Sequence, residues 1–163
     1  MIDIRETQEN EAIILSEMQK RAFQPLYEKY HDDGNPYLRG VEDILCRLNS
    51  LYYRCFTIFE GNEIVGCIWY KCKGKEPSGR ELTEGEYYLQ RVFIEPEHQG
   101  RRRAQTAILL CEKEFQDARY FSVDFPEDMQ KNRRCYEKAG FHDTGKRVEV
   151  MPGLVLAYLE KSC

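Results

Sequence analysis

Apolar residues recur along the chain with two different spacings, and each spacing predicts one kind of element. Residues 2–5 alternate between apolar and polar, which is typical of a short strand. From about residue 8 to residue 30, apolar side chains recur every three or four positions, which predicts a long helix capped by Thr7. Pro25 lies inside this run. Because proline lacks an N–H and its ring clashes with the preceding turn, we expect it to kink or divide the helix.

The pattern changes from helical to extended near residue 52. Before that point, a loop rich in Asp, Gly, Asn and Pro at residues 31–36 separates the first helix from a shorter one over residues 41–48. Residues 52–60 and 63–73 are rich in aromatic and β-branched side chains and flank a Gly-Asn pair. They therefore form a predicted β-hairpin.

The second half of the chain alternates strands with helices. Residues 74–85 carry Gly, Pro, Ser and many charges, so we expect an exposed loop that has nothing to bury. Beyond the loop, the pattern predicts a strand over 86–94, a helix from 105 to about 118, a strand over 119–125, a helix capped by Asp128 that ends at Lys138 before Gly140, and a closing hairpin of 147–150 and 154–159.

The predicted order is β-α-α-β-β-β-α-β-α-β-β, which indicates a mixed α/β fold with one central sheet. At 163 residues the chain is long enough to bury a core without disulfides, and it contains no internal repeat. We therefore expect one domain over residues 1–163.

Composition narrows the function classes. The N-terminus does not resemble a signal peptide and no apolar run is long enough to span a membrane, so we expect a cytoplasmic protein with no membrane partner. The seven cysteines are scattered and form no CxxC pair, which indicates reduced thiols rather than disulfides or a zinc site; no metal is predicted. A net charge of −4 argues against nucleic acid as a partner.

One turn stands out against this acidic background. Residues 92–105 join an extended run to a helix through a turn that contains Pro, Gly and three consecutive arginines. The first N–H groups of a helix have no partner within it, and the helix dipole favours an anion there. This turn is therefore a candidate phosphate or pyrophosphate site. The alternative is a solvated basic turn that only caps the helix.

Two separate segments resemble the GNAT superfamily of N-acetyltransferases. The segment V-F-I-E-P-E-H-Q-G-R-R-R-A at residues 92–104 is similar to the family's acyl-CoA signature V-x-P-x-x-[QR]-x-x-G-x-[GA]. The segment N-R-R-C-Y-E-K-A-G-F at residues 132–141 is similar to the family's N-x-x-x-Y-E-K-x-G-F ending. The resemblance implies a GNAT-like acyl-CoA N-acyltransferase fold, in which flanking helices cover a mixed sheet splayed between its fourth and fifth strands.

The resemblance also implies that acetyl-CoA is the cosubstrate. Its pantetheine arm would pair with the strand edge at Val92, Phe93 and Ile94, and Asn132 would contact this arm or an ordered water. Its pyrophosphate would lie on the backbone amides of Gly100, Arg101, Arg102, Arg103, Ala104 and Gln105. The family usually has glycine where Arg102 stands, so Arg102 either turns its guanidinium outward, reaches back to a phosphate, or weakens the site.

By the same resemblance, Tyr136 stands where the family has the general acid that protonates the departing thiolate. Without the motif, Tyr136 would be a half-buried aromatic on an amphipathic helix. Asp124 and Glu86, at strand ends, are candidates for the base that deprotonates the amine. A water relay is the alternative, and His98 in the basic turn is expected to be exposed.

The implied reaction is direct transfer of acetyl from acetyl-CoA to a primary amine. Glu28, Asp32 and Asp33 form an acidic rim that would attract a small cationic amine, although a solvated helix end explains them equally well. The alternatives are a protein or peptide N-acetyltransferase and a non-catalytic acyl-CoA sensor. A homodimer formed through the closing hairpin is also possible by analogy with the family.

Overall fold

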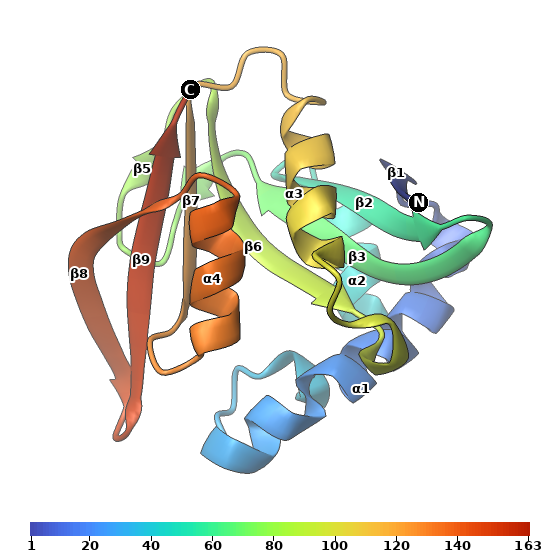
Figure 1. Cartoon of the computed structure of the whole chain (residues 1–163), viewed down its shortest axis with the longest axis horizontal. Coiled ribbons are helices and arrows are strands. Elements are labelled where there is room, and N and C mark those ends of the chain that lie inside the picture. Colours follow the sequence, from blue (N-terminus) through green and yellow to red (C-terminus); the bar gives the residue numbers. More distant parts are fainter.

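The computed structural model describes all 163 residues, and a seven-stranded sheet runs through it (Figure 1). The strand order is β1-β2-β3-β6-β7-β9-β8, and only the neighbours β6 and β7 are parallel. The strands are β1 (Ile2–Glu6), β2 (Tyr53–Glu60), β3 (Glu63–Lys71), β6 (Glu86–Ile94), β7 (Tyr120–Pro126), β8 (His142–Met151) and β9 (Leu154–Ser162). The helices are α1 (Ala12–Tyr30), α2 (Val41–Leu48), α3 (Arg103–Glu112) and α4 (Gln130–Lys138). None of these helices combines the length and apolarity needed to cross a bilayer.

The sheet separates two hydrophobic cores. Successive strand residues point to opposite faces, so Ile68 and Tyr70 of β3 enter the core beneath α3 and α4. Cys67 and Trp69 enter the smaller core beneath α1 and α2. Figure 1 shows α3 and α4 side by side on the front of the sheet, with α1 crossing below it. The predicted mixed α/β architecture is confirmed.

The predicted splay between the fourth and fifth strands is confirmed at β6 and β7. The two strands pair only over Glu86–Leu89 and Tyr120–Val123. Beyond Leu89 they diverge, and the end of β6 pairs only with β3 while the end of β7 pairs only with β9. A shift of register between β3 and β6 follows Leu89, so a bulge in β6 accompanies the divergence.

A buried polar network holds the splayed end of β6 against α1 and α2. Arg91 donates to Asp43 at 2.8 Å and to Gln19 at 3.0 Å. Arg47 donates to Asp43, and both Arg47 and the Trp69 indole donate to Gln90 at 2.8 Å. Arg91 and Asp43 expose only 11% and 14% of their side chains, so these charges are stabilised mainly by each other.

Helix α1 differs from its prediction at two points. It runs without interruption from Ala12 to Tyr30, so Pro25 does not divide it. Thr7 does not cap it, because its hydroxyl accepts a hydrogen bond from Thr57. A short turn at Glu9–Glu11 leads into the helix instead, and there the Gln8 N–H donates to the Glu11 carboxylate at 2.9 Å.

The segment at residues 74–85 is not the exposed loop that its composition predicts. It forms a small hairpin of β4 (Gly74–Lys75) and β5 (Glu81–Leu82). Glu76 and Leu82 are buried in it, and the Glu76 carboxylate accepts hydrogen bonds from Ser78 and from Ser122 on β7. The composition of the segment predicts that Glu76 is solvated, but its contact with Ser122, which is distant in sequence, buries it.

Three predicted boundaries also move. Asp128 does not cap α4, because Met129 is the cap residue and the Asp128 carboxylate binds Lys29 and Tyr30 at the end of α1. Helix α3 begins at Arg103 and ends at Glu112, earlier than predicted at both ends. Strand β8 begins at His142 rather than at residue 147, and it is largely exposed.

Candidate active site

The turn between β6 and α3 presents a cluster of backbone N–H groups that have no partner. Gly100, Arg101 and Arg102 follow one another in the left-handed conformation, with φ of 90°, 54° and 60°. The Arg103 N–H donates to the Gly100 carbonyl, whereas the N–H groups of Gly100, Arg101, Arg102, Ala104 and Gln105 make no hydrogen bond within the chain. Consecutive unpaired amides at a helix N-terminus are the geometry that binds phosphate oxygens.

The three arginines of this turn have different surroundings. Arg103 forms a two-point ion pair with Glu60 of β2, at 3.0 and 2.9 Å, so its guanidinium is occupied. Arg101 is exposed and does not line the adjoining groove. Arg102 lines the groove, is exposed and makes no ion pair. The family usually has glycine at this position. For arginine, the left-handed backbone conformation costs roughly 1–2 kcal/mol of folding free energy.

A groove of about 570 Å³ runs from this turn into the splay between β6 and β7. The resemblance named ten cofactor-binding residues, and all except Arg101 line this groove: Val92, Phe93, Ile94, Gly100, Arg102, Arg103, Ala104, Gln105 and Asn132. Tyr136 lines it as well. The structure thus brings two motifs that are far apart in the sequence to one cavity.

The groove also contains residues that the sequence reasoning missed. Lys131, Arg134 and Lys138 of α4 line it, and no Asp or Glu does. Their spacing of three and four positions places them on one side of a helix, and this spacing was the available signal. The groove is therefore basic in a chain whose net charge is −4.

Strand β6 supplies polar backbone groups at the splay. The Glu95 N–H, just past the strand, donates to the Val65 carbonyl of β3 at 2.7 Å. Successive N–H groups of a strand point to alternate edges. The N–H groups of Val92 and Ile94 therefore point away from β3, toward the edge from which β7 has diverged. These two donors face the groove that the splay opens.

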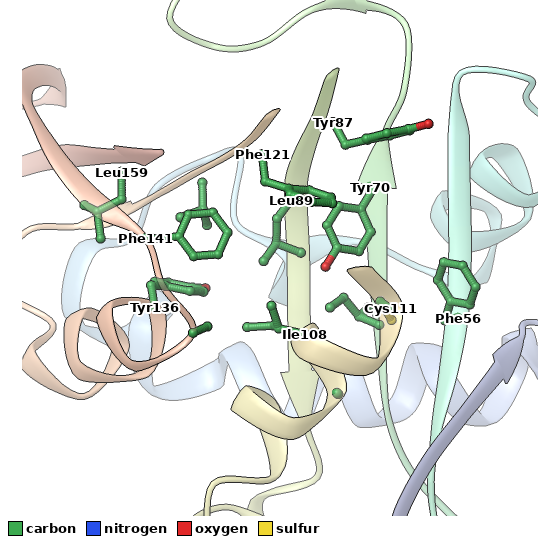
Figure 2. Close-up of a cluster of buried hydrophobic side chains, with 14 of the residues drawn as sticks. Phe56, Tyr70, Tyr87, Leu89, Ile108, Cys111, Phe121, Tyr136, Phe141 and Leu159 are labelled. Carbon is green, nitrogen blue, oxygen red and sulfur yellow. The ribbon is translucent and has the colours of Figure 1, made fainter. Parts of the chain in front are cut away.

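Tyr136 lies on the inner side of α4, at the edge of the main core. Figure 2 shows it beside Phe141, and its ring centroid is 5.3 Å from that of Phe125. Only 7% of the residue is exposed, and its hydroxyl makes no hydrogen bond within the chain. Burial raises the pKa of the Tyr136 phenol well above its ordinary value, so this group stays protonated at neutral pH.

A second cavity, of about 590 Å³, adjoins the groove and has the opposite charge. Asp32, Asp33 and Asp124 line it, and no Lys or Arg does. Its apolar walls come from α1, from the end of β7 and from the β8–β9 hairpin. Leu26 of α1 lines both cavities, so the two meet at this side chain.

The two candidate bases occupy different ends of the sheet. Asp124 lies at the splay, where Tyr88 of β6 donates to its carboxylate at 2.6 Å. Burial raises the pKa of Asp124, and hydrogen bonds from Tyr88 and Tyr158 oppose this shift in part. Glu86 lies at the paired start of β6, where Arg80 and the Thr83 N–H bind its carboxylate. Glu86 is therefore remote from both cavities.

Two other predicted positions also lie outside the cavities. Glu28 lines neither cavity and accepts a hydrogen bond from Gln24 at 3.0 Å. His98 is not fully exposed as predicted, because it lies half-buried between Glu60 and Glu63, at 3.5 and 3.4 Å.

Known structures share this fold along nearly the whole chain. An acetyltransferase from Thermus thermophilus superposes with a TM-score of 0.73 at 20% identity, over 100% of this chain and 97% of that one. The PaiA N-acetyltransferase from Thermoplasma acidophilum, in complex with coenzyme A, gives 0.74 at 18% identity, over 100% and 99%. AAC(6')-Ib in complex with ribostamycin and coenzyme A gives 0.76 at 14% identity, over 99% and 93%.

The sequence comparison covers the same two motifs. No curated protein sequence matches the chain. The model of the acetyltransferase (GNAT) family, however, matches residues 15–141, which include the candidate anion-binding turn at residues 100–105, the splayed strands and Tyr136. The chain therefore belongs to the acetyltransferase (GNAT) family, whose members are acetyl-CoA-dependent acyltransferases.

Proposed function

We propose that this protein transfers acetyl from acetyl-CoA directly to a primary amine, most suitably a small cationic one. The observation that carries the proposal is the pair of adjoining cavities with opposite charge. A polyanionic cosubstrate suits the basic groove, and a cationic acceptor suits the acidic cavity. Their shared wall at Leu26 is where an acetyl group would pass from one to the other.

The residues of the groove fit acetyl-CoA. The unpaired amides from Gly100 to Gln105 suit the pyrophosphate, and Arg102 adds a charge that no carboxylate neutralises. The free edge of β6 suits the amide-containing pantetheine arm, which would pair with it as an added strand. Asn132 lines the same wall and offers a side-chain amide.

Acetyl-CoA supplies the acetyl group as a thioester, whose carbonyl carbon is the electrophile. In the proposed mechanism one free backbone N–H of β6 donates to the carbonyl oxygen and stabilises the negative charge that develops there. Asp124 accepts a proton from the attacking amine. The Tyr136 phenol, which burial keeps protonated, donates a proton to the departing sulfur.

The acidic cavity supports a cationic acceptor. Asp124 lies beside the splay, while Asp32 and Asp33 belong to the loop that follows α1. An acceptor with a second positive charge would place one amine at the splay and the other at this loop. Among the structural neighbours, AAC(6')-Ib is described as an aminoglycoside acetyltransferase and was solved with ribostamycin.

The test measures CoA release for matched acceptors. We expect an alkyl diamine to give kcat/KM at least about tenfold higher than the ω-amino acid of equal length, because the second group changes from cation to anion. A short peptide with a free N-terminus tests the alternative protein acceptor. Preference for the amino acid or the peptide would contradict a small cationic acceptor, and no release with any amine would contradict the enzyme.

Matched variants test whether the acidic cavity causes the preference for the diamine. Asp32→Asn and Asp33→Asn should each reduce the preference for the diamine several-fold. Glu28→Gln removes the same charge from the neighbouring end of α1, outside the cavity. An equal effect of all three substitutions would mean that bulk charge, not the cavity, selects the acceptor.

A further inference from the structure

The basic wall of the groove formed by α4 has no role in the mechanism above. Lys131, Arg134 and Lys138 line the groove from this helix, opposite the anion-binding turn at the start of α3. None of them makes an ion pair or donates a side-chain hydrogen bond within the chain. Their neighbour Arg133, by contrast, donates to Asp143 at 2.9 Å.

The lack of carboxylate partners sets these cations apart. Most arginines elsewhere in the molecule are paired, for example Arg103 with Glu60, Arg21 with Glu95, and Arg147 with Asp143. Unpaired cations close together on one helix repel each other. The arrangement therefore suits an anion that binds between them.

Acetyl-CoA carries one more phosphate than the turn accounts for. Its pyrophosphate matches the unpaired amides between Gly100 and Gln105, but its ribose carries a separate 3′-phosphate. That phosphate is a dianion at neutral pH and needs charged side chains more than backbone amides. The α4 wall provides three such side chains in the same groove.

We propose that Lys131, Arg134 and Lys138 form a subsite for the 3′-phosphate of CoA and thereby select CoA over its 3′-dephospho form. This inference rests on the proposed use of acetyl-CoA. Arg134 suits a two-point contact with phosphate oxygens, whereas the two lysines act as point charges on either side of it. The subsite would make the α4 helix a specificity determinant for the cosubstrate.

The test compares calorimetric affinities for CoA and 3′-dephospho-CoA. Wild type should bind CoA about tenfold or more tightly, and increasing salt should reduce this difference. The triple variant Lys131→Gln, Arg134→Gln, Lys138→Gln should bind CoA only as tightly as wild type binds the dephospho form. Its affinity for the dephospho form should stay within about twofold of wild type.

Arg133→Gln is the control for position, since it removes one positive charge from the same helix at a guanidinium that faces Asp143. It should leave the discrimination unchanged. Equal affinity of wild type for both ligands would overturn the subsite. So would a triple variant that weakens both ligands equally, because its cations would then act on the pyrophosphate. No binding of either ligand would instead overturn the proposed function itself.

Discussion

The Tyr88 phenol donates a hydrogen bond of 2.6 Å to Asp124 across the last paired residues of β6 and β7. This bond stabilises the carboxylate form, while burial favours the neutral form and raises the pKa. Burial is the larger effect, so the pKa of Asp124 lies above its ordinary value. Its position at the splay makes it the base that we favour for the amine.

Removing this bond should shift the pH profile. In Tyr88→Phe the carboxylate loses a donor, so the pKa of Asp124 should rise further. Because the base works only when deprotonated, activity falls as the pH falls through this pKa. The acidic limb of kcat/KM should therefore move to higher pH. Asp124→Asn should abolish the limb together with most activity, and an unchanged profile in both variants would exclude Asp124 as the base.

Tyr136→Phe should separate turnover from binding. The substitution removes only the hydroxyl, which makes no hydrogen bond within the chain, so stability should change little. Loss of a general acid should lower kcat by about a hundredfold or more. Calorimetric affinity for CoA should stay within about threefold of wild type. A variant that keeps full turnover would favour a water molecule as the acid.

Gly66→Ala should displace the cofactor strand. A Cβ at Gly66 would lie 2.1 Å from the Phe93 carbonyl oxygen, so the backbone of β6 must move. We expect a loss of about 2–3 kcal/mol in unfolding free energy and weaker CoA binding. Gly34→Ala is the control, because a Cβ there meets no atom within 4 Å. Denaturant unfolding of both variants measures the difference, and equal stability would contradict the close approach.

Asp43→Asn should reveal the buried network through its pH dependence. Burial disfavours the Asp43 carboxylate, but Arg91 and Arg47 outweigh burial and lower its pKa. Its stabilisation is therefore complete above its unfolded-state pKa and is lost as the pH falls through the lower folded value. The variant should lose about 3 kcal/mol of unfolding free energy at neutral pH and much less in strong acid. A loss that does not depend on pH would contradict the ion pairs.

Arg102→Gly and Gly100→Ala should change stability in opposite directions. Both positions have positive φ, where glycine avoids the steric cost that other residues meet. Gly100→Ala should lower the free energy of unfolding by about 1 kcal/mol. A Cβ at this position would meet no neighbouring atom, so the loss comes from the backbone conformation alone. Arg102→Gly should raise the melting temperature, because glycine removes this steric cost. A large loss in Arg102→Gly would show that the Arg102 side chain stabilises the fold.

The local sequence pattern predicted those features of the fold that depend on neighbouring residues. The order of helices and strands followed from spacing, and the two motifs named residues that the structure brings to one groove, among them Tyr136. The failures involve partners distant in sequence. Asp128 resembles a helix cap but binds Lys29 and Tyr30, and Glu76 looks solvated but is buried against Ser122. These contacts form only in the folded chain between residues that are distant in sequence. They therefore cannot be predicted from a short segment of the sequence.

The same distant pairing explains the unexpected occupation of Arg103. The three consecutive arginines gave no sign of which guanidinium would be paired, because the partner of Arg103 is Glu60 on another strand. The α4 cations were missed for a different reason. Their helical spacing was visible, but their meaning depended on α4 and α3 lying side by side over the splay.

Helix α1 is tied to both sides of the opening between β6 and β7. Arg21 binds Glu95 just past β6, and Lys29 and Tyr30 bind Asp128 just past β7. The helix therefore bridges the opening on its own side, and a long cosubstrate has to arrive from the side of α3 and α4. The acidic cavity that we propose for the acceptor is lined by the C-terminal half of α1, at Leu26 and Tyr30. Because the two proposed routes do not cross, we expect the cavities to fill in either order, which predicts a random ternary-complex scheme in steady-state kinetics.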